Sequence, residues 1–180
     1  MQFWNNLFFW AFLSMIGWFL SLLVIGSKTF GRSNLFGVFV VALVEIPRII
    51  LPLDFITQPR FGEETILPTI GFIILIGALV FGTPAFLIKP FTMPQKEEEL
   101  RTTGFYSVIR HPIMFCDSFW PLGLSLVFRS SIGTALVGVW FIAAYLLTFL
   151  EEEKLIEEYG EDYLKYKEKT PRIIPFLKFL

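Results

Sequence analysis

The sequence predicts an all-α, polytopic membrane helix bundle with about five transmembrane helices and a cytoplasmic C-terminal helix. Two observations lead to this fold class. Of 180 residues, 54% are hydrophobic and 18% are aromatic, and they gather in long runs without charges. One compact core of this length cannot conceal so much apolar surface, so part of it should face lipid. We expect a single membrane domain over 1–180, with three spans in 1–90, and two spans and a tail in 91–180.

Three uncharged runs are long enough to cross a bilayer as single helices. They cover residues 3–25, 66–88 and 132–150. At about 1.5 Å per residue the first two reach roughly 34 Å, enough for a hydrocarbon core of about 30 Å, and the third is only slightly shorter. The first run is too long for the apolar part of a signal peptide and follows no basic segment, so we interpret it as a span.

Two further apolar segments contain polar residues. Segment 35–53 contains Glu45, Pro47 and Arg48, and its proline predicts a kink or break near the middle. Glu45 and Arg48 share one helical face, so we expect them to pair; lining of a substrate pocket is the second interpretation of Glu45. Segment 113–128 is short and contains an aspartate and a proline. It is either a tilted span or half of a hairpin with the next helix.

Lysine and arginine lie mostly on one side of these five spans. The loops 26–34 and 89–112 and the tail after residue 150 contain all of the 15 basic residues except Arg48, Arg60 and Arg129. The positive-inside rule makes that side cytoplasmic, with the C-terminus in the cytoplasm.

The tail begins as a predicted helix over 151–169 that runs out of the membrane. Its apolar and aromatic side chains recur at helical spacing and form one face among charged residues. They are Leu155, Tyr159, Tyr163 and Tyr166. Thr170 and Pro171 end the helix, and the apolar segment that follows is expected at the membrane surface.

Two polar clusters fall on the predicted cytoplasmic side at the depth of the interface. Arg110 and His111 precede the fourth span, and Glu151 and Glu152 follow the fifth. Taken singly, a basic anchor and a solvated helix start are the simpler interpretations. Together, beside aromatic residues, they indicate a site that holds a polar cofactor outside while an apolar substrate approaches from lipid.

Composition argues against two other kinds of site. The chain has one histidine and one cysteine, so no Cys/His metal site is expected within it. No basic face is interleaved with aromatic residues, so no nucleic-acid partner is expected either.

The two clusters belong to longer motifs that resemble a known superfamily. The first motif is Gly104-x-Tyr106-x-x-x-Arg110-His111-Pro112. The second is Glu151-Glu152-x-x-Leu155, followed by Tyr159-Gly160-x-x-Tyr163-x-x-Tyr166 and Pro171-Arg172-Ile173-Ile174-Pro175. In order and spacing they are similar to the signature of the isoprenylcysteine carboxyl methyltransferase and phospholipid methyltransferase superfamily. The chain departs from the usual pattern at Phe105, Met114 and Cys116.

The resemblance implies an integral membrane methyltransferase that uses S-adenosylmethionine without a Rossmann domain. Its methyl acceptor would be hydrophobic or lipid-like, and its other partner is the bilayer. The residues it assigns to cofactor binding are Gly104, Tyr106, His111, Pro112, Glu152, Tyr159 and Tyr163. Those it assigns to catalysis are Arg110, Glu151, Glu152 and Arg172. The two arginines would hold a carboxylate of either the cofactor or the substrate.

Two other functions stay open at the level of sequence. The ending Arg172-Ile173-Ile174-Pro175-Phe176 also resembles the tail of NADPH-dependent sterol and steroid reductases. A non-catalytic membrane protein of the same fold is the other alternative. The acceptor group, whether carboxylate, amine or thiol, is also open.

Overall fold

The computed structural model describes residues 5–26, 34–63, 66–88 and 100–177. Within these ranges all regular secondary structure is helical, and the one pairing of extended backbone is an isolated antiparallel bridge between Arg60 and Ser130. The predicted all-α class is therefore confirmed.

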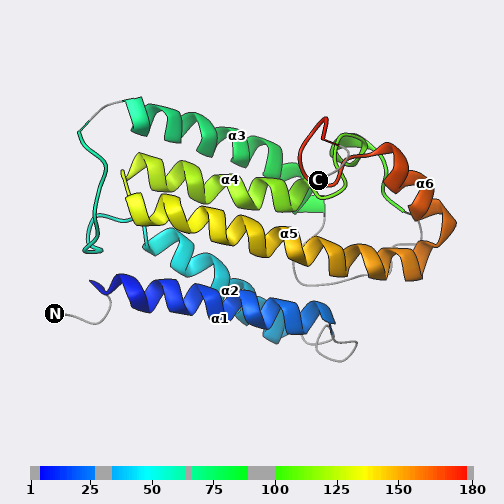
Figure 1. The fold of residues 1–180 in the computed structure, drawn as a ribbon, viewed down its shortest axis with the longest axis horizontal. Helices are drawn as coiled ribbons and strands as arrows, with labels where there is room; N and C mark the ends of the chain where they lie inside the picture. Colours follow the sequence, from blue (N-terminus) through cyan, green and yellow to red (C-terminus); the bar gives the residue numbers. More distant parts are fainter. Residues whose placement is uncertain (1–4, 27–33, 64–65, 89–99, 178–180) are drawn as a thin grey trace.

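Five longer helices and two short ones follow one another along the described chain. They are α1 (Leu7–Gly26), α2 (Asn34–Ile50), α3 (Ile66–Ile88), η3 (Gly104–Ser107), α4 (Pro112–Val127), α5 (Ser131–Tyr159) and α6 (Glu161–Lys169). In Figure 1, α3, α4, α5 and α1 lie alongside one another, with α6 and the end of the chain gathered at one end of the bundle. α3 packs on α4, α4 packs on α5, and α1 packs on both α2 and α5.

One helix in the described ranges, α5, is long and apolar enough by length and composition to cross a membrane. Three shorter apolar stretches accompany it, at Leu7–Leu23, Ile66–Phe81 and Pro112–Val127. The arrangement of five spans stays a prediction.

Two helices differ from their predicted course. α2 continues through Pro47 and ends at Ile50, where the Leu51 amide donates to the Pro47 carbonyl at 2.8 Å. A break near its middle is therefore wrong, and the alternative, a kink at Pro47, stays a prediction. The single helix expected over 151–169 is also wrong, because α5 ends at Tyr159 and the chain turns at Gly160 before α6. Gly160 has a φ of +53°, which favours glycine and stops the helix.

A buried ionic cluster ties α2 to α4 inside the bundle. Arg48 is fully buried, and its Nη1 donates to Glu45 Oε1 at 2.9 Å and to Asp117 Oδ1 at 3.0 Å. The rings of Trp18, Trp120 and Trp140 surround the guanidinium, with centroids 5.1–5.8 Å away. The predicted pairing of Glu45 with Arg48 is therefore confirmed, with Asp117 as a second acidic partner that lowers the cost of burying the arginine.

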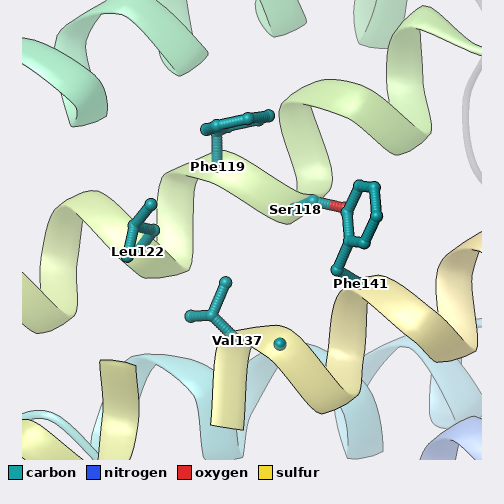
Figure 2. Close-up of a pocket in the computed structure, with 6 residues that line it drawn as sticks. Ser118, Phe119, Leu122, Val137 and Phe141 are labelled. Carbon is teal, nitrogen blue, oxygen red and sulfur yellow. The ribbon is translucent and has the colours of Figure 1, made fainter. Parts of the chain in front are cut away.

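An apolar groove lies open between α4 and α5. It has a volume of about 300 Å³ and is lined by Ser118, Phe119, Leu122, Val137, Gly138 and Phe141. Figure 2 shows Val137 and Phe141 rising from α5 toward the α4 residues Ser118 and Leu122. The groove is apolar apart from the Ser118 hydroxyl, which donates to the carbonyl of Met114 on its own helix.

α3 and α4 approach closely at two glycines. A Cβ atom on Gly71 would lie 2.7 Å from the Gly123 carbonyl oxygen, and one on Gly123 would lie 2.6 Å from the Leu75 amide nitrogen. Any side chain at either position would force the two backbones apart. Small residues at such crossings let helices pack backbone against backbone.

We expect Gly123→Leu to lower the free energy of unfolding by about 1–3 kcal/mol, the usual cost of overpacking. Thermal unfolding in detergent measures the change. Gly77→Ala on α3 is the matched control, because no atom lies within 4 Å of its added Cβ. Equal stability of the two variants would contradict the close α3–α4 contact.

Candidate active site

The start of α4, the end of α5 and the C-terminal tail meet at one end of the bundle. Pro112 occupies the first turn of α4, where its missing amide donor costs nothing. The backbone amides of the two residues before it donate to the tail: the Arg110 amide donates to Pro171 O at 2.8 Å and the His111 amide to Arg172 O at 3.0 Å. The tail therefore lies directly against the start of α4.

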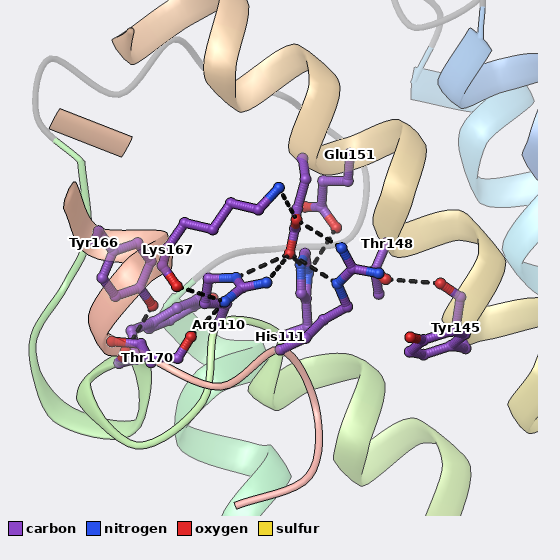
Figure 3. Close-up of polar contacts among 11 residues, drawn as sticks. Arg110, His111, Tyr145, Thr148, Glu151, Tyr166, Lys167 and Thr170 are labelled. Atoms are coloured by element: carbon purple, nitrogen blue, oxygen red, sulfur yellow. Dashed lines mark hydrogen bonds and ion pairs between the residues drawn. The ribbon is translucent and has the colours of Figure 1, made fainter. Parts of the chain in front are cut away.

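Glu152 is the centre of this meeting point. Its side chain on α5 is only 2% exposed, and both of its oxygens accept from basic side chains. Figure 3 shows Arg110, His111 and Lys167, three of its neighbours, with their side chains pointing toward one another. Oε1 accepts from Arg110 Nη2 at 2.7 Å and Nε at 2.9 Å. Oε2 accepts from Arg172 Nη2 at 3.0 Å and lies 3.1 Å from Lys167 Nζ. One carboxylate thus joins the start of α4, the end of α6 and the tail.

Arg110 also binds the end of α6 through backbone carbonyls. Its Nη1 donates to Lys167 O at 3.0 Å and to Thr170 O. These are carbonyls of the last turn of α6 and of its C-cap, which have no partner within the helix. Nearby, the Tyr166 hydroxyl donates to the Tyr106 carbonyl at 2.6 Å and joins α6 to η3.

Aromatic rings of α5 support Arg172. The centre of its guanidinium lies 3.7 Å from the Phe149 ring centroid and 5.5 Å from that of Tyr145. Cation–π contacts of this kind restrict the plane of the guanidinium. Arg172 is therefore held between a carboxylate and an aromatic face.

The pairings change the protonation of both acids and bases in the site. Burial opposes ionisation of Glu152, but hydrogen bonds from His111, Arg110, Arg172 and Lys167 outweigh it and hold its pKa well below the usual range. Burial by itself would lower the pKa of His111, yet its contacts to Glu151 and Glu152 raise the pKa overall. Glu152 is consequently ionised at neutral pH, and protonation of His111 is favoured.

The described part of the site has more positive than negative charge. Three basic side chains, Arg110, Lys167 and Arg172, surround one buried carboxylate. Glu151, whose side chain is 37% exposed, lies 3.3 Å from His111 Nδ1 and is the second acid. The surplus positive charge favours an anionic group of a ligand, and Glu151 is the acid best placed to meet a cationic one.

The predicted site residues fall into two groups. The structure brings together Arg110, His111, Glu151, Glu152 and Arg172 within one network.

The glycine and tyrosines of the motif lie around this network in different environments. Gly104 is exposed in η3 with a φ of +64°, and Tyr106 and Tyr159 are half-buried. Tyr163 is fully buried against Tyr166, with ring centroids 5.9 Å apart, and burial raises its pKa. Its ring packs within the protein, and its role in cofactor binding stays a prediction.

Sequence reasoning did not select two residues of the network. Lys167 pairs with Glu152, and Phe149 lies under Arg172. Phe149 lies three residues before Glu152, so a helix over this segment predicts that both side chains lie on the same face. The contact of Lys167 with Glu152 could not be predicted in this way, because it depends on the turn at Gly160 that brings α6 back toward α5.

Within the described ranges no three His, Cys, Asp or Glu side chains gather so as to hold a metal ion. The fold and site define an all-helical protein whose apolar helices end in a buried ionic site.

The sequence profile of the family described as phospholipid methyltransferase matches residues 70–162, just over half of the chain. The chain belongs to this family, and the predicted superfamily is confirmed.

Individual relatives agree with the family. The chain is 30% identical over 130 residues to protein-S-isoprenylcysteine O-methyltransferase of Xenopus laevis, covering 67% of this chain and 44% of that protein. It is 30% identical over 84 residues to the Schizosaccharomyces pombe protein of the same name, covering 46% of this chain and 35% of the relative. The cobalt-zinc-cadmium resistance protein CzcN of Cupriavidus metallidurans is 29% identical over 83 residues, covering 46% and 38%.

The chain spans less than half the length of these curated relatives. No solved structure matches it at a significant level. Several relatives are named as methyltransferases. The prediction that the chain belongs to a family of methyltransferase enzymes is therefore confirmed.

The raised pKa of His111 predicts a pH dependence of stability. A group whose pKa is higher in the folded state stabilises the fold fully below its unfolded value, and that stabilisation is lost as the pH rises through the folded value. We therefore expect the melting temperature of the wild type to fall above about pH 6.5, with a free-energy slope of at most about 1.4 kcal/mol per pH unit.

Thermal unfolding in detergent between about pH 6 and 9 measures this dependence. His111→Gln keeps a polar group without the titration, so its curve should be flatter. The same slope in both proteins would contradict the assignment to His111. Glu152 does not contribute in this window, because its lowered pKa affects stability only under more acidic conditions.

Proposed function

We propose that this chain is an integral membrane methyltransferase that uses S-adenosylmethionine to methylate a lipid-like or small hydrophobic acceptor at the membrane–cytosol interface. One observation carries the proposal: a buried, cation-rich site lies at the end of the same two helices, α4 and α5, that line an apolar groove. Such a pair of environments suits a polar cofactor and an apolar acceptor that must meet.

The proposal includes a membrane placement. The helices α1 to α5 are the five spans, 1–180 forms one membrane domain, and the C-terminus is cytoplasmic. Exposed large apolar side chains on α1 and α3, such as Phe8 and Ile73, support contact with lipid. The predominance of Lys and Arg in the loops on one side supports the orientation.

The charges of the site fit the proposed cofactor. S-adenosylmethionine has a carboxylate, an ammonium and a sulfonium group, and it supplies an electrophilic methyl group when bound. The surplus positive charge around Arg110 and Arg172 would attract the carboxylate of S-adenosylmethionine. Glu151 is exposed enough to meet a cationic group, and the half-buried rings of Tyr106 and Tyr159 would supply aromatic faces for one.

Protonation in the site favours a carboxylate acceptor over an amine. A carboxylate needs no base and is an anion that suits the surplus positive charge. An amine must lose a proton, but Glu152 is a poor base because its pKa is lowered and its oxygens are occupied. The raised pKa of His111 favours its protonated form. The names of the isoprenylcysteine O-methyltransferase relatives agree with this choice.

The groove offers a place for the apolar part of the acceptor. Phe141 lies three turns before Glu152 on α5, about 16 Å along the helix axis. Ser118 lies about two turns into α4, which begins directly after His111. The groove is therefore in register with the ionic site, and an extended hydrocarbon chain would reach from one to the other.

Binding of S-adenosylhomocysteine to the purified protein in lipid nanodiscs tests the cofactor. By calorimetry we expect the wild type to bind, and Glu151→Gln and Glu152→Gln to bind at least about tenfold more weakly, equivalent to 1.4 kcal/mol. Glu153→Gln is the matched control, since this neighbouring side chain is exposed.

A melting curve for each variant separates loss of the site from loss of the fold. Glu151→Gln is the more informative variant, because it leaves the pairs between Glu152 and the arginines intact. A folded wild type that binds no S-adenosylhomocysteine would overturn the proposal. Binding of NADPH in its place would favour a reductase.

Filling the groove tests the acceptor path. We expect Gly138→Leu to raise KM for a prenylcysteine carboxylate acceptor by at least about tenfold, because the added side chain occupies the space of about two methylenes at about 0.8 kcal/mol each. KM for S-adenosylmethionine should not change. Val139→Leu is the control, because Val139 is exposed and does not line the groove. Equal acceptor KM in the two variants would place the acceptor elsewhere.

A further inference from the structure

The tail continues beyond Arg172 into a short apolar end. We propose that Phe176 and Leu177 insert into the interfacial region of the lipid bilayer and thereby hold the tail against the active site. The proposal rests on the membrane placement given above and is independent of which cofactor binds.

The path of the tail brings it back to the depth of the bilayer surface. α5 extends beyond its apolar part, and α6 folds back after the turn at Gly160. The tail then pairs with Arg110 and His111 at the start of α4. Figure 1 shows the end of the chain beside the adjoining ends of α3 and α4. Phe176 is only four residues beyond Arg172, so it lies near the depth at which α4 begins.

The two end residues differ sharply from the residue that docks the tail. Ile173 is 1% exposed, whereas Phe176 is 96% exposed and Leu177 is 46% exposed. Phe176 also has a φ of +70°, a conformation that is unfavourable for an aromatic residue. Exposure of a whole phenyl ring to water is unfavourable, and insertion of the ring at a lipid interface removes that exposure.

The neighbouring surface is apolar as well. Phe81, exposed on α3, contacts Phe105 of η3 edge to face, with ring centroids 5.5 Å apart. Val108, just after η3, is 50% exposed. The apolar surface of α3 thus continues past the helix onto the segment that pairs with the tail. This continuity favours the bilayer, rather than a soluble partner, as the occupant.

Insertion would have a consequence for the site. The tail contributes Arg172 to Glu152 and the Thr170 and Pro171 carbonyls to Arg110. The ion pair of Arg172 with Glu152 holds the first part of the tail. Insertion of Phe176 would hold the part that follows Arg172. Phe176 is therefore a positioning residue, and it acts on ligands through Arg172.

A spin label at residue 176 tests the insertion directly. In a Cys116→Ala background, Phe176→Cys is labelled in nanodiscs, and collision rates with oxygen and with a water-soluble nickel complex give its depth. Lys165→Cys on exposed α6 is the aqueous control, and Phe72→Cys on α3 is the lipid control. We expect residue 176 to favour oxygen, as residue 72 does. A profile like that of residue 165 would overturn the proposal.

Enzyme kinetics test the consequence for the site. Phe176→Ser should raise KM for S-adenosylmethionine several-fold in nanodiscs, and Phe176→Leu, which is still apolar, should restore it. Leu164→Ser on α6 is the matched control, since Leu164 is also exposed and apolar. Equal KM values for Phe176→Ser and Leu164→Ser would overturn the positioning role. The depth measurement needs no activity, so failure of the methyltransferase proposal and failure of the anchor are distinguishable.

Discussion

The burial of Glu152 among basic side chains is the interaction on which the rest of the site depends. A carboxylate removed from water is strongly unfavourable unless cations and hydrogen bonds replace its hydration. Arg110, Lys167 and Arg172 provide that replacement, and each comes from a different segment. One acidic residue therefore fixes the direction of α6, the course of the tail and the position of the start of α4.

The helices that hold this network also separate two environments. The ends of α4 and α5 carry surplus positive charge, while the groove between them is apolar. Contacts with α3 and with α2 fix the position of α4. α3 packs on α4 through Gly71 and Gly123, and Arg48 links α2 to α4 within a ring of tryptophans. A frame of this kind would hold the proposed polar cofactor and apolar acceptor in register, as methyl transfer by in-line displacement requires.

The differences between prediction and structure have local causes. Proline removes one amide donor, but α2 tolerates Pro47 and continues for three more residues. The periodic aromatic residues of 151–169 predict one helix, yet Gly160 adopts a positive φ and reverses the chain. That reversal brings Lys167 to Glu152 and buries Tyr163 beside Tyr166.

The sequence by itself determined the all-helical class, the approximate extent of the helices and the two clusters at the end of α4 and α5. Apolar runs and motif spacing are local properties, so they can be followed along the chain. Only the tertiary structure decided which charges pair. The partners of Glu152 lie 42 and 20 residues away at Arg110 and Arg172, and basic residues elsewhere in the tail look alike in sequence. Which of them meets a buried carboxylate depends on how the chain turns between helices, because an ion pair forms only where folding brings both charges together out of water.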